Sequence, residues 1–142
     1  MEMKMTAKQE LNEIKAIHRE VVMLNQQRSE LREQAFSLKS VSGTLSPDKV
    51  QTSLDGDRFA EIFASIDETE RNLVERLKVL DEKKSHVMRK INAMPDHRYK
   101  TLLYDKYVLF MSWEEIAHIM RYSLRRVFQL HSEALNLYET LH

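Results

Sequence analysis

The chain has 142 residues, and its 22 basic and 22 acidic side chains balance, which excludes a global positive field that would attract nucleic acid. It has no cysteine, which excludes disulfide bonds and thiolate metal sites, and no apolar run approaches the ~20 residues that span a membrane. Two glycines and two prolines among many helix-forming residues predict an all-α protein.

The first predicted element is a long amphipathic helix over residues 6–39. Thr6 and Gln9 have the spacing of a capping box that would begin it. One face carries apolar residues in steps of three and four, with Arg28 at the one polar position of the series. The apolar positions are Ile14, Ile17, Val21, Leu24, Leu31, Ala35 and Leu38. This heptad pattern is typical of a helix that packs along its length on another helix.

Residues 40–57 predict a loop, because Gly43, Pro47 and Gly56 stand there among several serines and threonines. A second long helix is predicted over residues 57–94, and Pro95 would end it. Its apolar positions are Phe59, Ile62, Ile66, Leu73, Leu77, Leu80, Val87, Ile91 and Met94, with Lys84 interrupting them.

Two helices of comparable length joined by one loop favour a long antiparallel, coiled-coil-like hairpin. A lone hairpin buries only one seam of each helix, so we expect residues 1–94 to form a homodimer. Packing of the hairpin on the C-terminal region and a monomeric hairpin are the alternatives.

Residues 95–142 predict a domain of three shorter helices, the first over residues 96–110. Ser112 and Ser123 each stand at an N-cap position, and only Arg121 and Tyr122 separate the two helices that they begin. The expected core positions are Leu102, Leu103, Tyr107, Phe110, Ile116, Ala117, Met120, Val127, Leu130, Ala134 and Leu137, covered by Tyr99, Tyr104 and Trp113. Two short helices with so tight a turn are typical of a helix-turn-helix.

The outward face of this unit indicates DNA as a partner. No acidic residue occurs from Ile116 to Ser132, whereas Arg121, Arg125 and Arg126 are present. Arg125 and Arg126 lie in the first turn after Ser123, the end that enters the major groove in this motif. Gln129 could pair with adenine as arginine does with guanine, and Leu124 could contact a thymine methyl group or pack in the core. Ordinary solvated residues on a bundle helix are the alternative reading of this face.

Catalysis finds no support in the sequence. The histidines at 18, 86, 97, 118, 131 and 142 lack the i, i+4 spacing of a metal site, and none accompanies a nucleophile. No glycine-rich phosphate loop is present. We therefore expect no enzyme activity, no cofactor and no metal.

The block LLYDKYVLFMSWEEIAHIMRYSLRRVFQLHSEAL, together with DKVQTSLDGD at residues 48–57, resembles a family of small proteins from phages and prophages of Gram-positive bacteria. These proteins are similar to region 4 of sigma factors and belong with the ArpU- and RinA-like late-gene transcription regulators. The resemblance covers residues 47–142. It implies a sigma-region-4-like domain in which Arg125, Arg126 and Gln129 face the bases, with Ser123 and Arg121 near phosphate. Arg121 departs from the family, which usually has glycine at this turn position.

Two classes of function follow. The first is a DNA-binding transcription regulator, acting as a dimer on double-stranded DNA in the cytoplasm of a bacterial host, with host RNA polymerase as a further partner. The second is a protein-binding module that docks on RNA polymerase or another host protein, including as an inhibitor, without specific DNA recognition. The acid-free arginine face favours the first class, and the balanced charge favours the second.

Overall fold

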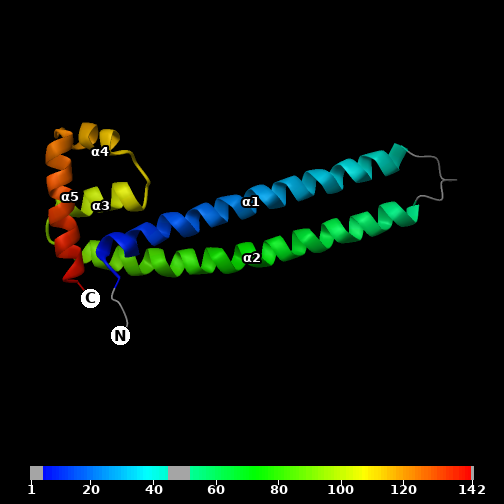
Figure 1. The fold of residues 1–142 in the computed structure, drawn as a ribbon, viewed down its shortest axis with the longest axis horizontal. Coiled ribbons are helices and arrows are strands. Elements are labelled where there is room, and N and C mark those ends of the chain that lie inside the picture. The colour runs from blue at the N-terminus through cyan, green and yellow to red at the C-terminus, as the bar shows by residue number, and fades with distance from the viewer. Residues whose placement is uncertain (1–4, 45–51, 142) are drawn as a thin grey trace. The chain divides into compact units, whose positions relative to one another are not determined.

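The computed structural model describes residues 5–44 and 52–141, with side chains described for residues 5–39 and 56–141. Within these ranges the chain forms helices and no strand, which confirms the all-α class. The helices are α1 (Ala7–Thr44), α2 (Thr52–Ala93), α3 (His97–Tyr107), α4 (Trp113–Met120) and α5 (Leu124–Glu139), as Figure 1 shows. The chain divides into two compact units, residues 5–18 with 79–141 and residues 19–44 with 52–78.

The two long helices begin and end largely as local signals predict, except around the expected loop. The Thr6 amide donates to Gln9 Oε1 at 2.9 Å and the Gln9 amide donates to Thr6 Oγ1 at 3.2 Å, so the predicted capping box is confirmed. The loop prediction was wrong for residues 40–44 and 52–56, which are helical. Serine, threonine and glycine disfavour helix by only ~1 kcal/mol each, which an extending long helix overcomes. Pro47 and its neighbours 45–51 lie outside the described residues.

In the unit of residues 19–78, α1 and α2 run antiparallel. Arg32 pairs with Glu70 at 2.8 Å, and Arg76 pairs with Glu20 at 3.3 Å. The later residue of α1 thus pairs with the earlier residue of α2, as antiparallel helices require. The seam between them buries Val21, Ile62 and Leu73. The other predicted seam residues of this unit, apart from Leu77, are half-buried. They are Leu24, Leu31, Ala35, Leu38, Phe59 and Ile66.

The seam of α2 departs from prediction at two places. Thr69 is buried in it and donates its hydroxyl hydrogen to the Ser65 carbonyl at 2.7 Å, which satisfies the group inside the helix. Leu77 is 45% exposed, whereas its neighbour Arg76 is half-buried. The steps from Thr69 to Leu73 to Arg76 to Leu80 keep to one face, so Leu77 falls on the flank of that face. Placing Leu77 in the seam was therefore wrong.

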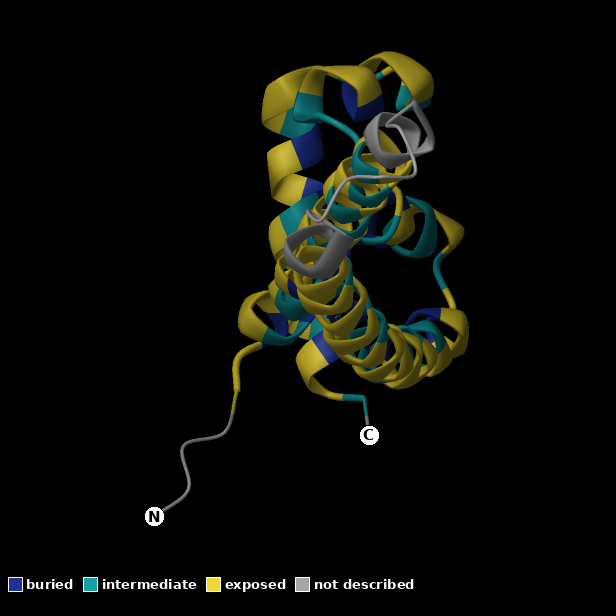
Figure 2. Cartoon of the chain, turned by 90° about the vertical axis from the view of Figure 1, so that its right-hand side faces the viewer, coloured by how far each residue is buried: buried dark blue, intermediate teal, exposed yellow. Residues whose placement is uncertain are grey.

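The other unit has a dense core to which the first turns of α1 and the last turns of α2 contribute alongside α3, α4 and α5. Its fully buried large residues are Leu11, Ile14, Val87, Ile91, Met94, Leu102, Leu103, Ile116, Val127, Leu130 and Tyr138. Figure 2 shows buried segments in dark blue and exposed ones in yellow. The last three helices contact one another pairwise. The residues after Pro95 therefore share one core with the start of α1 and the end of α2.

Helix α3 begins as expected and ends early. Asp96 is its N-cap and accepts from the Arg98 amide at 2.9 Å. The helix ends at Tyr107, not at Phe110 as the spacing predicts, and Phe110 has a left-handed backbone with φ 57°. A left-handed residue cannot continue an α-helix, so Phe110 turns the chain toward Ser112.

Among the described residues, no helix has the length and apolar character needed to cross a membrane.

Candidate nucleic-acid interface

Two serine caps and one tight turn position α4 and α5. Ser112 Oγ accepts from the Glu115 amide at 3.1 Å, and Ser123 Oγ accepts from the Arg126 amide at 3.1 Å. Both N-caps predicted from the sequence are confirmed. Each satisfies one of the amides that the first helical turn leaves without a backbone partner.

Arg121 closes α4 in the left-handed conformation, with φ 59° and ψ 41°. Its amide donates to the His118 carbonyl at 3.3 Å, and the Tyr122 amide donates to the Ala117 carbonyl at 3.0 Å. These bonds satisfy the last carbonyls of α4 in the way that a glycine C-cap usually does. The arginine side chain is exposed. The turn thus has the backbone that favours glycine while presenting a cation to solvent.

The inward face of α5 fixes which side chains point outward. Val127, Leu130 and Ala134 are fully buried, as predicted, and Tyr138 joins them in place of Leu137, which is half-buried. Tyr138 stands four residues beyond Ala134 on the same helical face, so the spacing alone was a usable signal that our sequence reading missed. At 100° per residue, the opposite face carries Arg125 and Gln129.

The structure places five of the six predicted contact residues at exposed positions: Arg121, Ser123, Leu124, Arg125 and Gln129. Leu124 is 39% exposed, so it packs only in part. Arg126 is half-buried on the flank of α5 and donates from a terminal guanidinium nitrogen to Gln129 Oε1 at 3.4 Å. This long hydrogen bond joins the Arg126 and Gln129 side chains, whereas no side-chain hydrogen bond of Arg125 occurs among the described residues.

Two carboxylates of this unit, Glu133 and Asp96, are engaged with partners outside this face. Glu133 accepts from the Tyr99 hydroxyl at 2.8 Å, a bond that raises the pKa of Tyr99. Asp96 holds Arg98 through both carboxylate oxygens, at 3.3 and 2.9 Å. This hydrogen bonding lowers the pKa of Asp96 and raises that of Arg98. The unpaired charge presented by the first turns of α5 is therefore positive.

Trp113, at the start of α4, packs against side chains of α3 and α5. Its ring meets Phe128 edge-on at 5.3 Å and His131 edge-on at 4.7 Å, and the Lys106 ammonium lies 4.5 Å from its centre. Since it is held between these groups and half-buried, Trp113 covers the core as expected. Tyr99 is also half-buried, whereas Tyr104 is 37% exposed and covers less of the core than predicted.

His131, which packs on Trp113, is half-buried and bonded to a neighbouring tyrosine. Its Nε2 lies 2.6 Å from the Tyr107 hydroxyl. Burial lowers the pKa of His131 to about 4 and raises that of Tyr107 to about 12. The two groups therefore satisfy each other's hydrogen bonding inside this unit.

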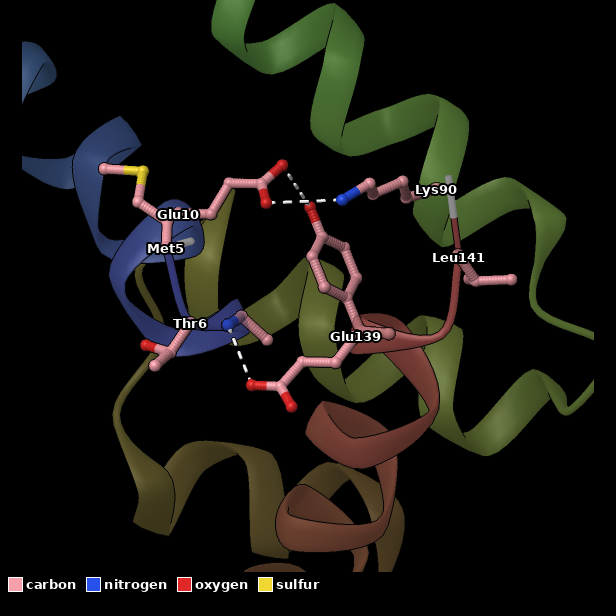
Figure 3. Close-up of a pocket in the computed structure, with 8 residues that line it drawn as sticks. Met5, Thr6, Glu10, Lys90, Glu139 and Leu141 are labelled. Atoms are coloured by element: carbon pink, nitrogen blue, oxygen red, sulfur yellow. Dashed lines mark hydrogen bonds and ion pairs between the residues drawn. The ribbon is translucent and has the colours of Figure 1, made fainter. Parts of the chain in front are cut away.

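A cavity of about 300 Å³ lies at the far end of α5, lined by Thr6, Glu10, Lys90, Glu139 and Leu141 among others (Figure 3). Glu10 and Lys90 form an ion pair at 3.3 Å across it. In the described ranges no three histidine, cysteine or acidic side chains lie together as metal ligands would. Sequence reasoning did not anticipate this cluster, because its members are separated by most of the chain.

Comparison of the chain with models of protein families, with curated proteins and with solved structures finds no match.

Proposed function

We propose that this chain is a phage-type DNA-binding transcription regulator in which α4 and α5 act as a sigma-region-4-like helix-turn-helix. The observation that carries the proposal is the exposed face of α5. Helix α5 begins at a serine cap after a tight left-handed turn, and its exposed face presents Arg125 and Gln129. No carboxylate occurs in the sequence from Ile116 to Ser132. A helix N-terminus also favours the negative charge of phosphate.

In this proposal the first two turns of α5 enter the major groove. Arg125 would pair with a guanine and Gln129 with an adenine. Arg126, which is bonded to Gln129, would lie beside the same base pairs. Ser123 and Arg121 would lie against the DNA backbone. Leu124 is exposed enough to contact a thymine methyl group.

The proposal includes a homodimer. Counted from Pro95, six basic residues face six acidic ones, so one copy gains little from phosphate attraction and needs a second. On α2, Phe63, Val74 and Leu77 are 57%, 66% and 45% exposed and fall within about 60° of one another around the helix. We propose that a second copy covers this apolar strip of residues 63, 74 and 77.

Docking on RNA polymerase or another host protein is the second candidate function. It is favoured by the exposed apolar residues near the arginines, since Ile119 and Phe128 are 58% and 46% exposed. Aromatic residues and arginine are enriched at protein interfaces. In this case late-gene control, or inhibition of a host system, would not require base contacts.

Selection of bound sites from a random DNA library at two salt concentrations tests the two functions. We expect a recurring motif that survives the higher salt, and its loss in the double variant Arg125→Ala with Arg126→Ala. Arg19→Ala, an exposed arginine of α1, is the matched control and should leave the motif unchanged. Recovery of no motif, with capture of purified RNA polymerase, would instead support the second function.

A further inference from the structure

One carboxylate connects three helices of the compact unit that contains α5. Glu10, on α1, accepts from the Tyr138 hydroxyl of α5 at 3.1 Å through Oε1. The same oxygen lies 2.8 Å from His86 Nε2, and Oε2 lies 3.3 Å from Lys90 Nζ, both on α2. Glu10 is four-fifths buried, with its side chain 19% exposed. We call these four residues the Glu10 joint.

The α5 end of the joint is held from several sides. Tyr138 is fully buried in the last turns of α5, and the Lys90 ammonium lies 4.7 Å from its ring centre. Burial first, and then the charge of Glu10, raise the pKa of Tyr138, so its hydroxyl remains a donor. The next residue, Glu139, accepts from the Ala7 amide at 3.1 Å, in the first turn of α1. The last turn of α5 thus makes two hydrogen bonds to α1 and one cation–π contact to α2.

From this arrangement we infer that Glu10 is a positioning residue for α5. Ser123 and the left-handed turn hold one end of the helix, and the Glu10 joint holds the other. At 1.5 Å per residue the 16-residue helix is a rod of about 24 Å, so freedom at its far end tilts the end that carries Arg125 and Gln129. The consequence for DNA rests on the proposed function; the local ordering of α5 does not.

The joint also couples α5 to the long helices. Any movement of the start of α1 against the end of α2 changes the distances around Glu10 and so alters the support of α5. Coupling of this kind acts in both directions. Fixing α5 on DNA therefore favours the same spacing of α1 and α2 that the joint requires.

Three single variants of the full chain test the inference. Glu10→Gln removes the charge at the centre of the joint, and Tyr138→Phe removes one hydroxyl while keeping the buried ring. Glu13→Gln is the matched control, because Glu13 pairs with Lys83 of α2 and has no bond to α5. Hydrogen exchange measured by mass spectrometry reports the ordering of residues 135–139, with α3 as the internal reference.

We expect exchange in residues 135–139 to rise about tenfold in Glu10→Gln and Tyr138→Phe, the change typical of losing a hydrogen bond to a charged group, and not in Glu13→Gln. Affinity for the selected DNA site should fall at least about threefold in the first two variants, with an unchanged salt slope because the phosphate contacts are the same. If Glu10→Gln unfolds, Tyr138→Phe decides the test.

Equal exchange of residues 135–139 in Glu10→Gln and Glu13→Gln would refute the claim that the Glu10 joint orders α5. Exchange that rises as much in α3 as in residues 135–139 would refute it too. Faster exchange in residues 135–139 with undiminished DNA affinity would overturn the positioning role. If the unaltered chain binds no DNA, the proposed function fails, while the exchange measurement still decides whether the joint orders α5.

Discussion

Replacing Arg121 by glycine should stabilise the chain, although it removes a side chain. Arg121 has φ 59° and ψ 41°, a conformation that costs a residue with a Cβ atom about 1–2 kcal/mol and costs glycine nothing. Glycine in turn gives the unfolded chain more freedom, which offsets about 0.4–1 kcal/mol. The side chain is exposed and makes no described contact that would be lost. The net expectation is a gain of about 0.5–1 kcal/mol.

Thermal and urea unfolding, followed by circular dichroism, measure this gain. For a chain of this size it corresponds to about 1–4 °C in Tm. Arg121→Ala is the control, because it removes the same side chain but keeps the backbone strain. Both variants should lose the same phosphate contact, so their DNA affinities should match. If glycine proves no more stable than alanine, the left-handed turn is not the source of strain.

Three further predictions concern the interface, the assembly and the core. Arg125→Ala or Arg126→Ala should cost about 1–3 kcal/mol of binding to the selected site, measured by titration, with folding unchanged; a loss equal across all sequences would indicate a phosphate-only role. Leu77→Asp should convert a dimer into a folded monomer in sedimentation, whereas Lys78→Asp beside it should not; an unaltered chain that is monomeric at high micromolar concentration would contradict the dimer. Because the pKa of His131 falls to about 4, its stabilising effect is complete above the unfolded pKa of ~6.5 and is lost as pH falls from there toward 4. His131→Gln should therefore flatten the pH dependence of the urea midpoint in that window, and an unflattened curve would refute the assignment.

The features that sequence predicted best are those that a few neighbouring residues determine. The caps at Thr6, Ser112 and Ser123 form because a side-chain oxygen reaches an amide two or three residues on, whatever surrounds them. The buried series on α5 was predictable for a similar reason, since helical spacing fixes a face. The left-handed turn at Arg121 was also predictable, from the tight connection and the glycine that the resembling family has there.

The features that sequence reasoning missed depend on distant partners or on competition between weak preferences. Glu10 and Tyr138 lie 128 positions apart, and nothing near either one indicates the other. Leu77 has the apolar character of a seam residue, yet the helical steps through Thr69, Leu73 and Leu80 place Arg76 on the seam face, where it pairs with Glu20 of α1. Around Gly43, a low helix preference lost to the propagation of an already formed helix.

The separation between Glu10 and Tyr138 also bears on how the chain folds as it is made. A ribosome releases residue 10 long before residue 138, at a rate of about 5–20 residues per second. Through that interval Leu11 and Ile14 lack the α5 residues with which they share a core, so the start of α1 leaves the ribosome with its apolar face uncovered. In the folded chain α1 pairs with α2 through Glu13 and Lys83, and Val87 and Ile91 of α2 are buried in the same unit, so pairing of these two helices would shield part of that face before α5 is made. The core can be completed only after Tyr138 has left the ribosome, so the last turns of α5 are the last part of this core to become available.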